Sequence, residues 1–163
     1  MWQRNERVWE KGTTMTTYER LVSELGDGLG IKFAPDDSGV VEMFAEDHAV
    51  LLRADETGEC ELTVFTVLAV APEGGFPPET LRRALEMNLF GREVAGHHLG
   101  LFADSLVLSA NLPIAGLTAE DLADRIVMLA RLAGELSGSL ELTSDAPAES
   151  AGPSSLDGPF MAV

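Results

Sequence analysis

The chain has 163 residues, of which 45% are hydrophobic and 23% charged, and it carries a formal net charge of −16. This length supports one domain with a sizeable core, and the composition excludes wholesale disorder, a membrane-spanning helix and, with Cys60 alone, an internal disulfide. Because residues 1–11 are polar, we also expect no secretory signal. Because 11 basic residues are scattered among 27 acidic ones, nucleic-acid binding and membrane insertion are disfavoured, and we expect a cytoplasmic protein with basic or amphipathic partners.

The two ends of the chain differ in composition from its middle. Residues 1–14 have no amphipathic period, and Met15 opens a segment typical of a protein start, so we expect 1–14 to be a disordered or mis-annotated extension. Residues 143–163 are rich in Ala, Ser, Pro and Gly and carry Asp145, Glu149 and Asp157 without a basic residue. This composition predicts a disordered acidic tail, which leaves residues 15–142 as the folded domain.

The first predicted element of the domain is an amphipathic helix. Thr16 and Glu19 have the spacing of a capping box, and leucines follow at positions 21, 25 and 29. The glycines at 26, 28 and 30 are expected to stop this helix.

Three strands follow in the pattern. Residues 40–44 and 49–53 are short candidate strands, and a turn at 55–58 leads into a longer one over 60–70. The even positions from Cys60 to Val70 are predicted to line one buried face. The odd positions change from polar to apolar at Phe65 and Val67, so the second face of this strand is expected to be covered by the chain or by a partner.

The second half of the domain repeats the alternation of helix and strand. Pro77 and Pro78 open a helix with leucines at 81, 85 and 89, and residues 99–103 and 106–112 form a hairpin. Thr118 caps a final helix whose apolar stripe runs from Leu122 to Leu140. The order α-β-β-β-α-β-β-α predicts an α+β fold with a twisted, mostly antiparallel sheet packed by helices.

No group of residues in the sequence has the spacing of a catalytic or metal site. His97 and His98 are neighbours on a strand and point to opposite faces, and His48 stands alone. Cys60 has no adjacent histidine or lysine and is expected to be a core residue. The glycines at 26, 28 and 30 follow a helix and lack the lysine of a phosphate loop. We therefore expect no enzyme activity, no cofactor and no metal, unless polar groups converge in a closed pocket.

Several segments together resemble the class I type III secretion chaperones of the Tir-chaperone (CesT-like) family. They are YERLVSELGDGLGI, ECELTVFTVLAV, LRRALEMNLF and the stretch HHLGLFADSLVLSANLPIAGLTAEDL, followed by a leucine-striped helix. Leu85, Asn88 and Leu89 match a leucine–asparagine cluster of the family, and Leu112-Pro113 matches its leucine–proline. The similarity covers about residues 16–142 and departs from the family at both ends of the chain.

The resemblance implies a homodimer that binds the N-terminal, non-globular segment of a secreted effector and keeps it competent for export, with the secretion ATPase as a further partner. An extended client pairs with an exposed sheet edge while its side chains fill apolar grooves. Our candidates for client contact are Leu21, Leu25, Phe44, Leu52, Phe65 and Val67, and core packing is the alternative for each. Our candidates for the dimer interface are Leu81, Leu85, Asn88, Leu89, Leu99 and Leu101. The alternative function is an acidic, non-catalytic binding module or inhibitor of the same fold without a role in secretion.

Overall fold

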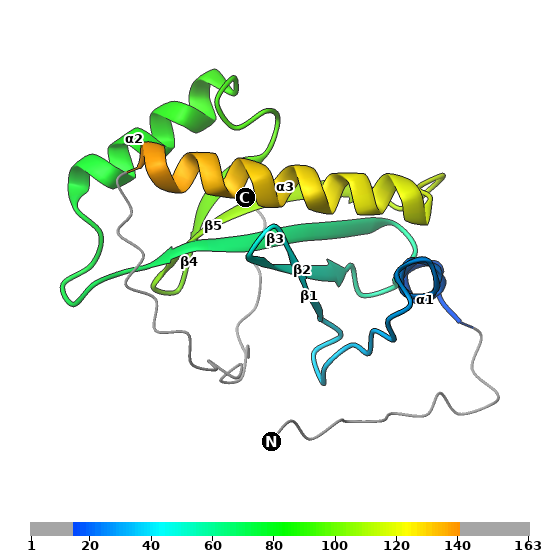
Figure 1. Ribbon diagram of the computed structural model, residues 1–163. Helices are drawn as coiled ribbons and strands as arrows, with labels where there is room; N and C mark the ends of the chain where they lie inside the picture. Colours follow the sequence, from blue (N-terminus) through cyan, green and yellow to red (C-terminus); the bar gives the residue numbers. More distant parts are fainter. Residues whose placement is uncertain (1–14, 141–163) are drawn as a thin grey trace.

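The computed structural model describes residues 15–140 and has the predicted element order (Figure 1). The elements are α1 (Thr17–Leu29), β1 (Val41–Ala45), β2 (His48–Ala54), β3 (Glu61–Val70), α2 (Pro78–Phe90), β4 (His98–Phe102), β5 (Ser105–Pro113) and α3 (Ala119–Ser139). The α+β fold class is confirmed. The expectations for residues 1–14 and 143–163 lie outside the described residues.

The five strands form one antiparallel sheet in the order β1-β2-β3-β5-β4. The long β3 lies at its centre, paired with β2 on one side and with β5 on the other. Strands β1 and β4 are therefore the two edges. Both belong to two-residue hairpins, with turns at Glu46-Asp47 and at Ala103-Asp104.

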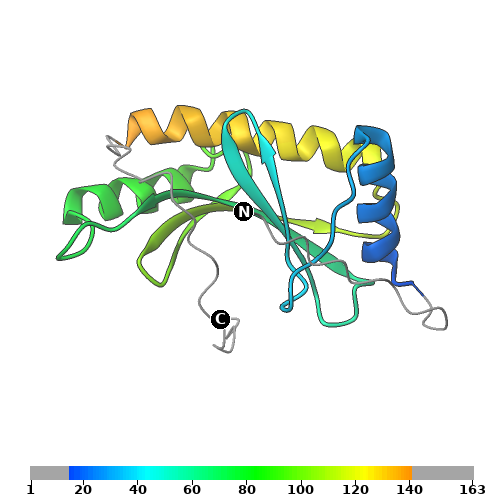
Figure 2. The same ribbon diagram turned by 60° about the horizontal axis from the view of Figure 1, so that its bottom comes forward.

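One face of the sheet carries the hydrophobic core. Helix α3 lies along this face and contacts β1, β2, β3 and β5, while α1 packs against α3 at one end (Figure 2). In both ribbon views no described helix covers the opposite face of the sheet. The predicted stripe of α3 is confirmed as core: Leu122, Ile126, Leu129, Ala133, Leu136 and Leu140.

Both threonine caps form as the sequence predicts. Thr16 accepts a hydrogen bond from the backbone of Glu19, whose carboxylate accepts one from Thr16, and Thr118 and Asp121 repeat this arrangement at α3. We expected the glycines at 26, 28 and 30 to stop α1, and only Gly30 does so. The helix runs through Gly26 and ends at Gly30, which takes the left-handed conformation that closes a helix.

Two of the predictions for β3 are wrong, one because the strand bulges and the other because it begins after Cys60. Leu62 and Val64 are buried as expected, but the register with β5 shifts between Val67 and Ala69, so alternation fails beyond that point and Val70 is exposed. Cys60, predicted to be a core residue, precedes the strand and is exposed.

Candidate functional site

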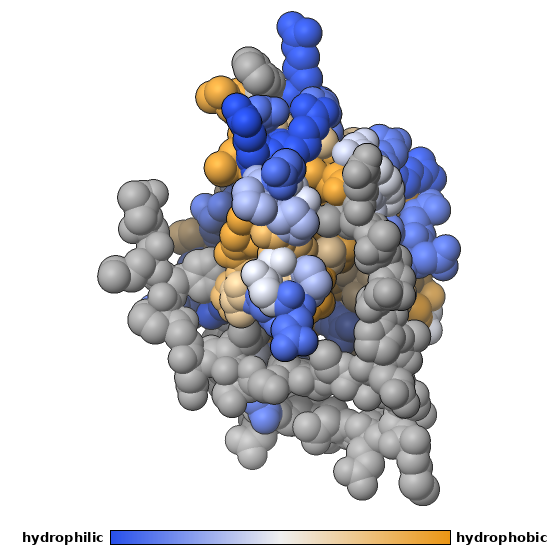
Figure 3. All heavy atoms as spheres, turned by 90° about the vertical axis from the view of Figure 1, so that its left-hand side faces the viewer, coloured by the Kyte–Doolittle hydropathy of each residue, from blue (hydrophilic) through white to orange (hydrophobic). Residues whose placement is uncertain are grey.

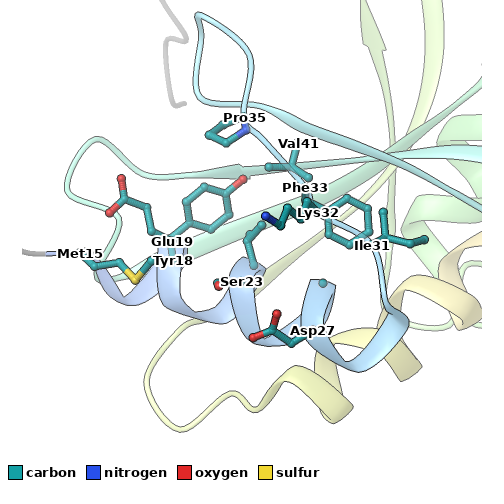
Figure 4. A pocket seen from close by; sticks show the side chains of 12 residues that line it. Met15, Tyr18, Glu19, Ser23, Asp27, Ile31, Lys32, Phe33, Pro35 and Val41 are labelled. Carbon is teal, nitrogen blue, oxygen red and sulfur yellow. The ribbon is translucent and has the colours of Figure 1, made fainter. Parts of the chain in front are cut away.

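A groove lies between α1 and the segment of residues 31–41 that leads into β1 (Figure 4). Its volume is about 230 Å³. The residues that line it are Met15, Tyr18, Glu19, Val22, Ser23, Gly26, Asp27, Ile31, Lys32, Phe33, Pro35 and Val41. The floor is mostly apolar, and charged side chains stand at the rim.

Tyr18 ties the groove to the sheet. Its ring is buried, and its hydroxyl donates a hydrogen bond to the carbonyl of Leu52 at 3.1 Å. Burial raises the pKa of Tyr18 well above its usual value, and the charge of Asp36 adds to this. The phenol is therefore a fixed, neutral part of the wall.

Gly26 brings the two walls of the groove together. The amide of Ile31 donates to the Gly26 carbonyl at 2.9 Å. A Cβ at position 26 would lie 2.5 Å from the Ile31 carbonyl oxygen and 3.4 Å from the ring of Phe33. Only glycine permits this approach.

The β1 edge beside the groove offers free backbone groups. The β1–β2 turn has positive φ at Glu46 and Asp47, so Ala45 and His48 form the closing hydrogen-bonded pair. Alternation along an antiparallel ladder then points the amides and carbonyls of Glu42 and Phe44 away from β2. Asp36 occupies the next outward position, because its carboxylate accepts from the Val40 amide at 2.9 Å and its own amide donates to the Val40 carbonyl at 2.8 Å.

The opposite edge, β4, is partly occupied by a side chain. Asn88 of α2 donates to the carbonyl of Leu99 at 2.7 Å and accepts from its amide at 2.8 Å. This amide takes the place that a neighbouring strand would have at Leu99. Asn88, which we predicted at the dimer interface, is half-buried and joins α2 to β4 within one chain, and its place in an interface stays a prediction.

The uncovered face of the sheet continues the apolar surface from the β1 edge. Phe44 is 76% exposed, Val67 is exposed and Phe65 is half-buried. Phe65 lies opposite Leu51 of β2, and Val67 lies opposite Val107 of β5, so these side chains share the face that turns away from α3.

Three of the predicted client-contact residues lie elsewhere. Leu21 and Leu25 are buried in the core and do not line the groove, whereas Tyr18 and Val22, which are also largely buried, form part of its lining. Leu52 is fully buried on the core face of β2. Tyr18, Val22 and Phe33, which line the groove, were not singled out from the sequence, although the spacing of Tyr18, Val22 and Gly26 indicates a second stripe on α1.

A second apolar surface lies on α2 and β4. Leu85 is 68% exposed and Leu89 is 78% exposed, and Leu101 is exposed on β4, the strand that α2 contacts. The inward residues of α2 are instead Ala84 and Met87. Figure 3 views the molecule from the side on which α2 lies in Figure 1, and hydrophobic patches there are bordered by hydrophilic side chains.

Two other residues that we predicted at the dimer interface, Leu81 and Leu99, are less exposed than Leu85 and Leu89. Leu99 is buried in the core beneath α2, so it is corrected to a core residue, and Leu81 is half-buried. Charges in residues 78–98 balance, with Glu79, Glu86 and Glu93 against Arg82, Arg83 and Arg92. Arg83 contacts Glu93 at 2.6 Å, and Arg82 contacts Glu86 at 3.5 Å.

The histidines and other potential metal ligands among the described residues do not gather into a site. The ring of buried His97 lies 2.9 Å from the carbonyl of Val94, joined through Nδ1. Residues 15–140 hold no cluster of three side chains suited to a metal ion. None of the helices described is long and apolar enough to cross a membrane.

A family model settles which proteins this chain is related to. The Tir chaperone protein (CesT) family matches over residues 20–152. The chain belongs to this family. In a comparison with curated proteins, no sequence matches this chain.

Solved structures with the same fold include two chaperone complexes and one further protein complex. The chain is similar to the Yersinia pestis type III secretion chaperone SycH, in complex with a fragment of YscM2, at 23% identity and a TM-score of 0.55, covering 73% of this chain and 98% of that one. The HopA1–SchA chaperone–effector complex matches at 19% identity and a TM-score of 0.55, covering 76% and 92%. The ExsC–ExsE complex matches at 20% identity and a TM-score of 0.62, covering 77% and 94%. At these identities the likeness concerns the fold.

Proposed function

We propose that this member of the Tir chaperone family is a cytoplasmic, non-catalytic chaperone that binds the N-terminal, non-globular segment of a type III secreted effector. The observation that carries the proposal is the free β1 edge, with the α1 groove on one side and the exposed side chain of Phe44 on the other. These three features are what an extended chain needs: backbone partners, a pocket for a side chain, and an apolar face.

In this proposal the client pairs with β1 as an added strand. The outward groups of Glu42 and Phe44 make its backbone hydrogen bonds, and Asp36 limits the pairing at Val40. The occupied position at Leu99 disfavours the β4 edge. Burial of Phe44 by the client contributes about 2 kcal/mol of apolar stabilisation.

We further propose that two copies associate through the α2 surface formed by Leu85, Leu89 and Leu101. Residues 15–77 carry 13 acidic and 3 basic side chains, so two copies repel each other there. The balanced charges of residues 78–98 allow close approach of a second copy. A two-fold interface built on this one patch is self-complementary.

The test uses secreted proteins co-expressed with the chaperone in its native host, each prepared intact and without about the first hundred residues. Calorimetry without nucleotide should detect binding of the intact proteins, with a negative heat-capacity change, and no binding of the truncated ones. Equal binding of intact and truncated proteins, or a requirement for ATP, would contradict the proposal and favour a binding module with another role.

The β1 edge is tested by hydrogen exchange and by one pair of variants. The amides of Glu42 and Phe44 should exchange more slowly in the complex, because they become hydrogen-bonded. Phe44→Glu should weaken binding at least tenfold without unfolding the protein, since Phe44 is exposed. Met128→Glu, a like change at an exposed position of α3, is the control and should bind normally. Protection at Leu101 in place of Phe44 would move the client to the other edge.

A further inference from the structure

The negative charge of the described chain gathers in the half that carries the groove. Residues 15–77 hold 13 of the acidic side chains and only Arg20, Lys32 and Arg53 as basic ones. The groove and the β1 edge lie within this half. A client segment that approaches them therefore enters a negative field.

The groove itself has two carboxylates on the α1 side and one cation on the other. Glu19 and Asp27 are eight residues apart, which places them about 12 Å apart along the helix, with Ser23 between them. Lys32 lies on the opposite wall. One carboxylate oxygen of Glu19 accepts from the Thr16 amide at 2.7 Å as part of the cap, whereas Asp27 lies exposed at the rim.

We infer that the α1 groove takes an apolar client side chain that is flanked by lysine or arginine. The apolar anchor lies on Tyr18, Val22 and Phe33, and the flanking cations lie near Asp27 and Glu19. The inference rests on the proposed function and adds the chemical class of the segment that this site selects.

The expected size of the charge preference follows from the solvent exposure of the charged side chains. Cation–carboxylate pairs at a protein surface are screened by water and salt, so each pair should change affinity by about two- to fivefold. Apolar contact gives most of the affinity, and charge selects among apolar segments. Lys32 opposes a basic client, so neutralising it should strengthen binding of such a client.

The experiment compares three fluorescein-labelled peptides of one design on the full-length protein at low salt. Each has leucines at alternating positions, and two lysines, two glutamines or two glutamates at each end. Fluorescence anisotropy should give the tightest binding with lysine, weaker binding with glutamine and the weakest with glutamate. Asp27→Asn should weaken the lysine peptide about two- to fivefold and leave the glutamine peptide unchanged.

Glu24→Gln supplies the matched control, because Glu24 is exposed on the same helix but does not line the groove. It should change binding of the lysine peptide less than Asp27→Asn does, and Lys32→Gln should tighten it. Equal binding of the lysine and glutamine peptides, or equal effects of Asp27→Asn and Glu24→Gln, would overturn this inference and leave the proposed function standing. Failure of all three peptides to bind would count against both.

Discussion

At the scale of single residues, Gly26 allows the close approach of α1 to Ile31 and Phe33 at the groove. Gly26→Ala would place a methyl group 2.5 Å from the Ile31 carbonyl oxygen, which cannot move without breaking the end of α1. We expect this variant to lower the free energy of unfolding by about 1 to 2 kcal/mol in urea denaturation, even though alanine favours a helix.

Gly28→Ala is the control for this prediction. Position 28 is also helical, but a Cβ there meets no atom within 4 Å. Its helix propensity alone should leave stability unchanged or raise it by up to about 1 kcal/mol. Equal effects of the two substitutions would mean that the close approach at Gly26 carries no weight.

Asp55 gives a second prediction at this scale, one that depends on pH. Its carboxylate accepts hydrogen bonds from Thr57 and from the backbone of Glu61 and Cys60, and these hold the pKa of Asp55 well below its usual value. A depressed pKa stabilises the folded state above the unfolded value, about 3.9, and this stabilisation is lost as the pH falls below it.

Asp55→Asn should therefore be less stable than the natural protein at neutral pH, and the difference should shrink below about pH 4. Urea denaturation over a pH series measures it. A difference that stays constant into acid would show that the charge of Asp55 does not hold the turn.

At the scale of elements, the two sides of α2 allow the proposed assembly to be tested separately from folding. Its buried side is Ala84 and Met87, while Leu85 and Leu89 face solvent in one chain. Leu85→Glu should therefore leave the fold intact and give monomers in light scattering, because the carboxylate would be buried only in the interface. Met128→Glu on α3 should leave the assembly unchanged, and monomers in the natural protein would refute the interface.

The edges of the sheet show a second distinction between elements. The two edge strands have similar sequence patterns, because each is a short apolar segment followed by a tight turn. In the fold, the Asn88 side chain occupies the backbone hydrogen-bonding groups of Leu99 within β4. On the other edge, Asp36 occupies only those of Val40, which precedes β1. The longer free stretch on β1 is the reason that we place the client there.

At the scale of the whole molecule, charge and apolar contact should separate in the kinetics. The negative field around residues 15–77 acts over a Debye length, about 10 Å at 0.1 M salt, whereas the groove and Phe44 act by contact. Raising the salt concentration should lower the association rate of a lysine-flanked client several-fold and change its dissociation rate little. Stopped-flow fluorescence measures both rates, and a salt effect confined to dissociation would contradict this division.

The sequence by itself determined the element order and the core of α3. Periods of two and of about 3.6 residues, threonine caps and terminal glycines are local signals, and they predicted eight elements in the order observed. The Phe65 and Val67 side of β3 was also predicted as a second apolar face, and it does turn away from α3. The family resemblance could be seen at this level because it rests on the order of such signals.

Only the tertiary structure decided which apolar residues stay accessible. Leu21, Leu25, Leu52 and Leu99 have the same chemistry as Leu85 and Leu89, yet the first four are core and the last two are surface. Cys60 and Val70 left the expected face because the strand starts later and bulges between Val67 and Ala69. Burial depends on contacts between different elements, such as α1 with α3 and α2 with β4. Periodicity within one segment cannot predict these contacts, because it depends only on that segment's own residues.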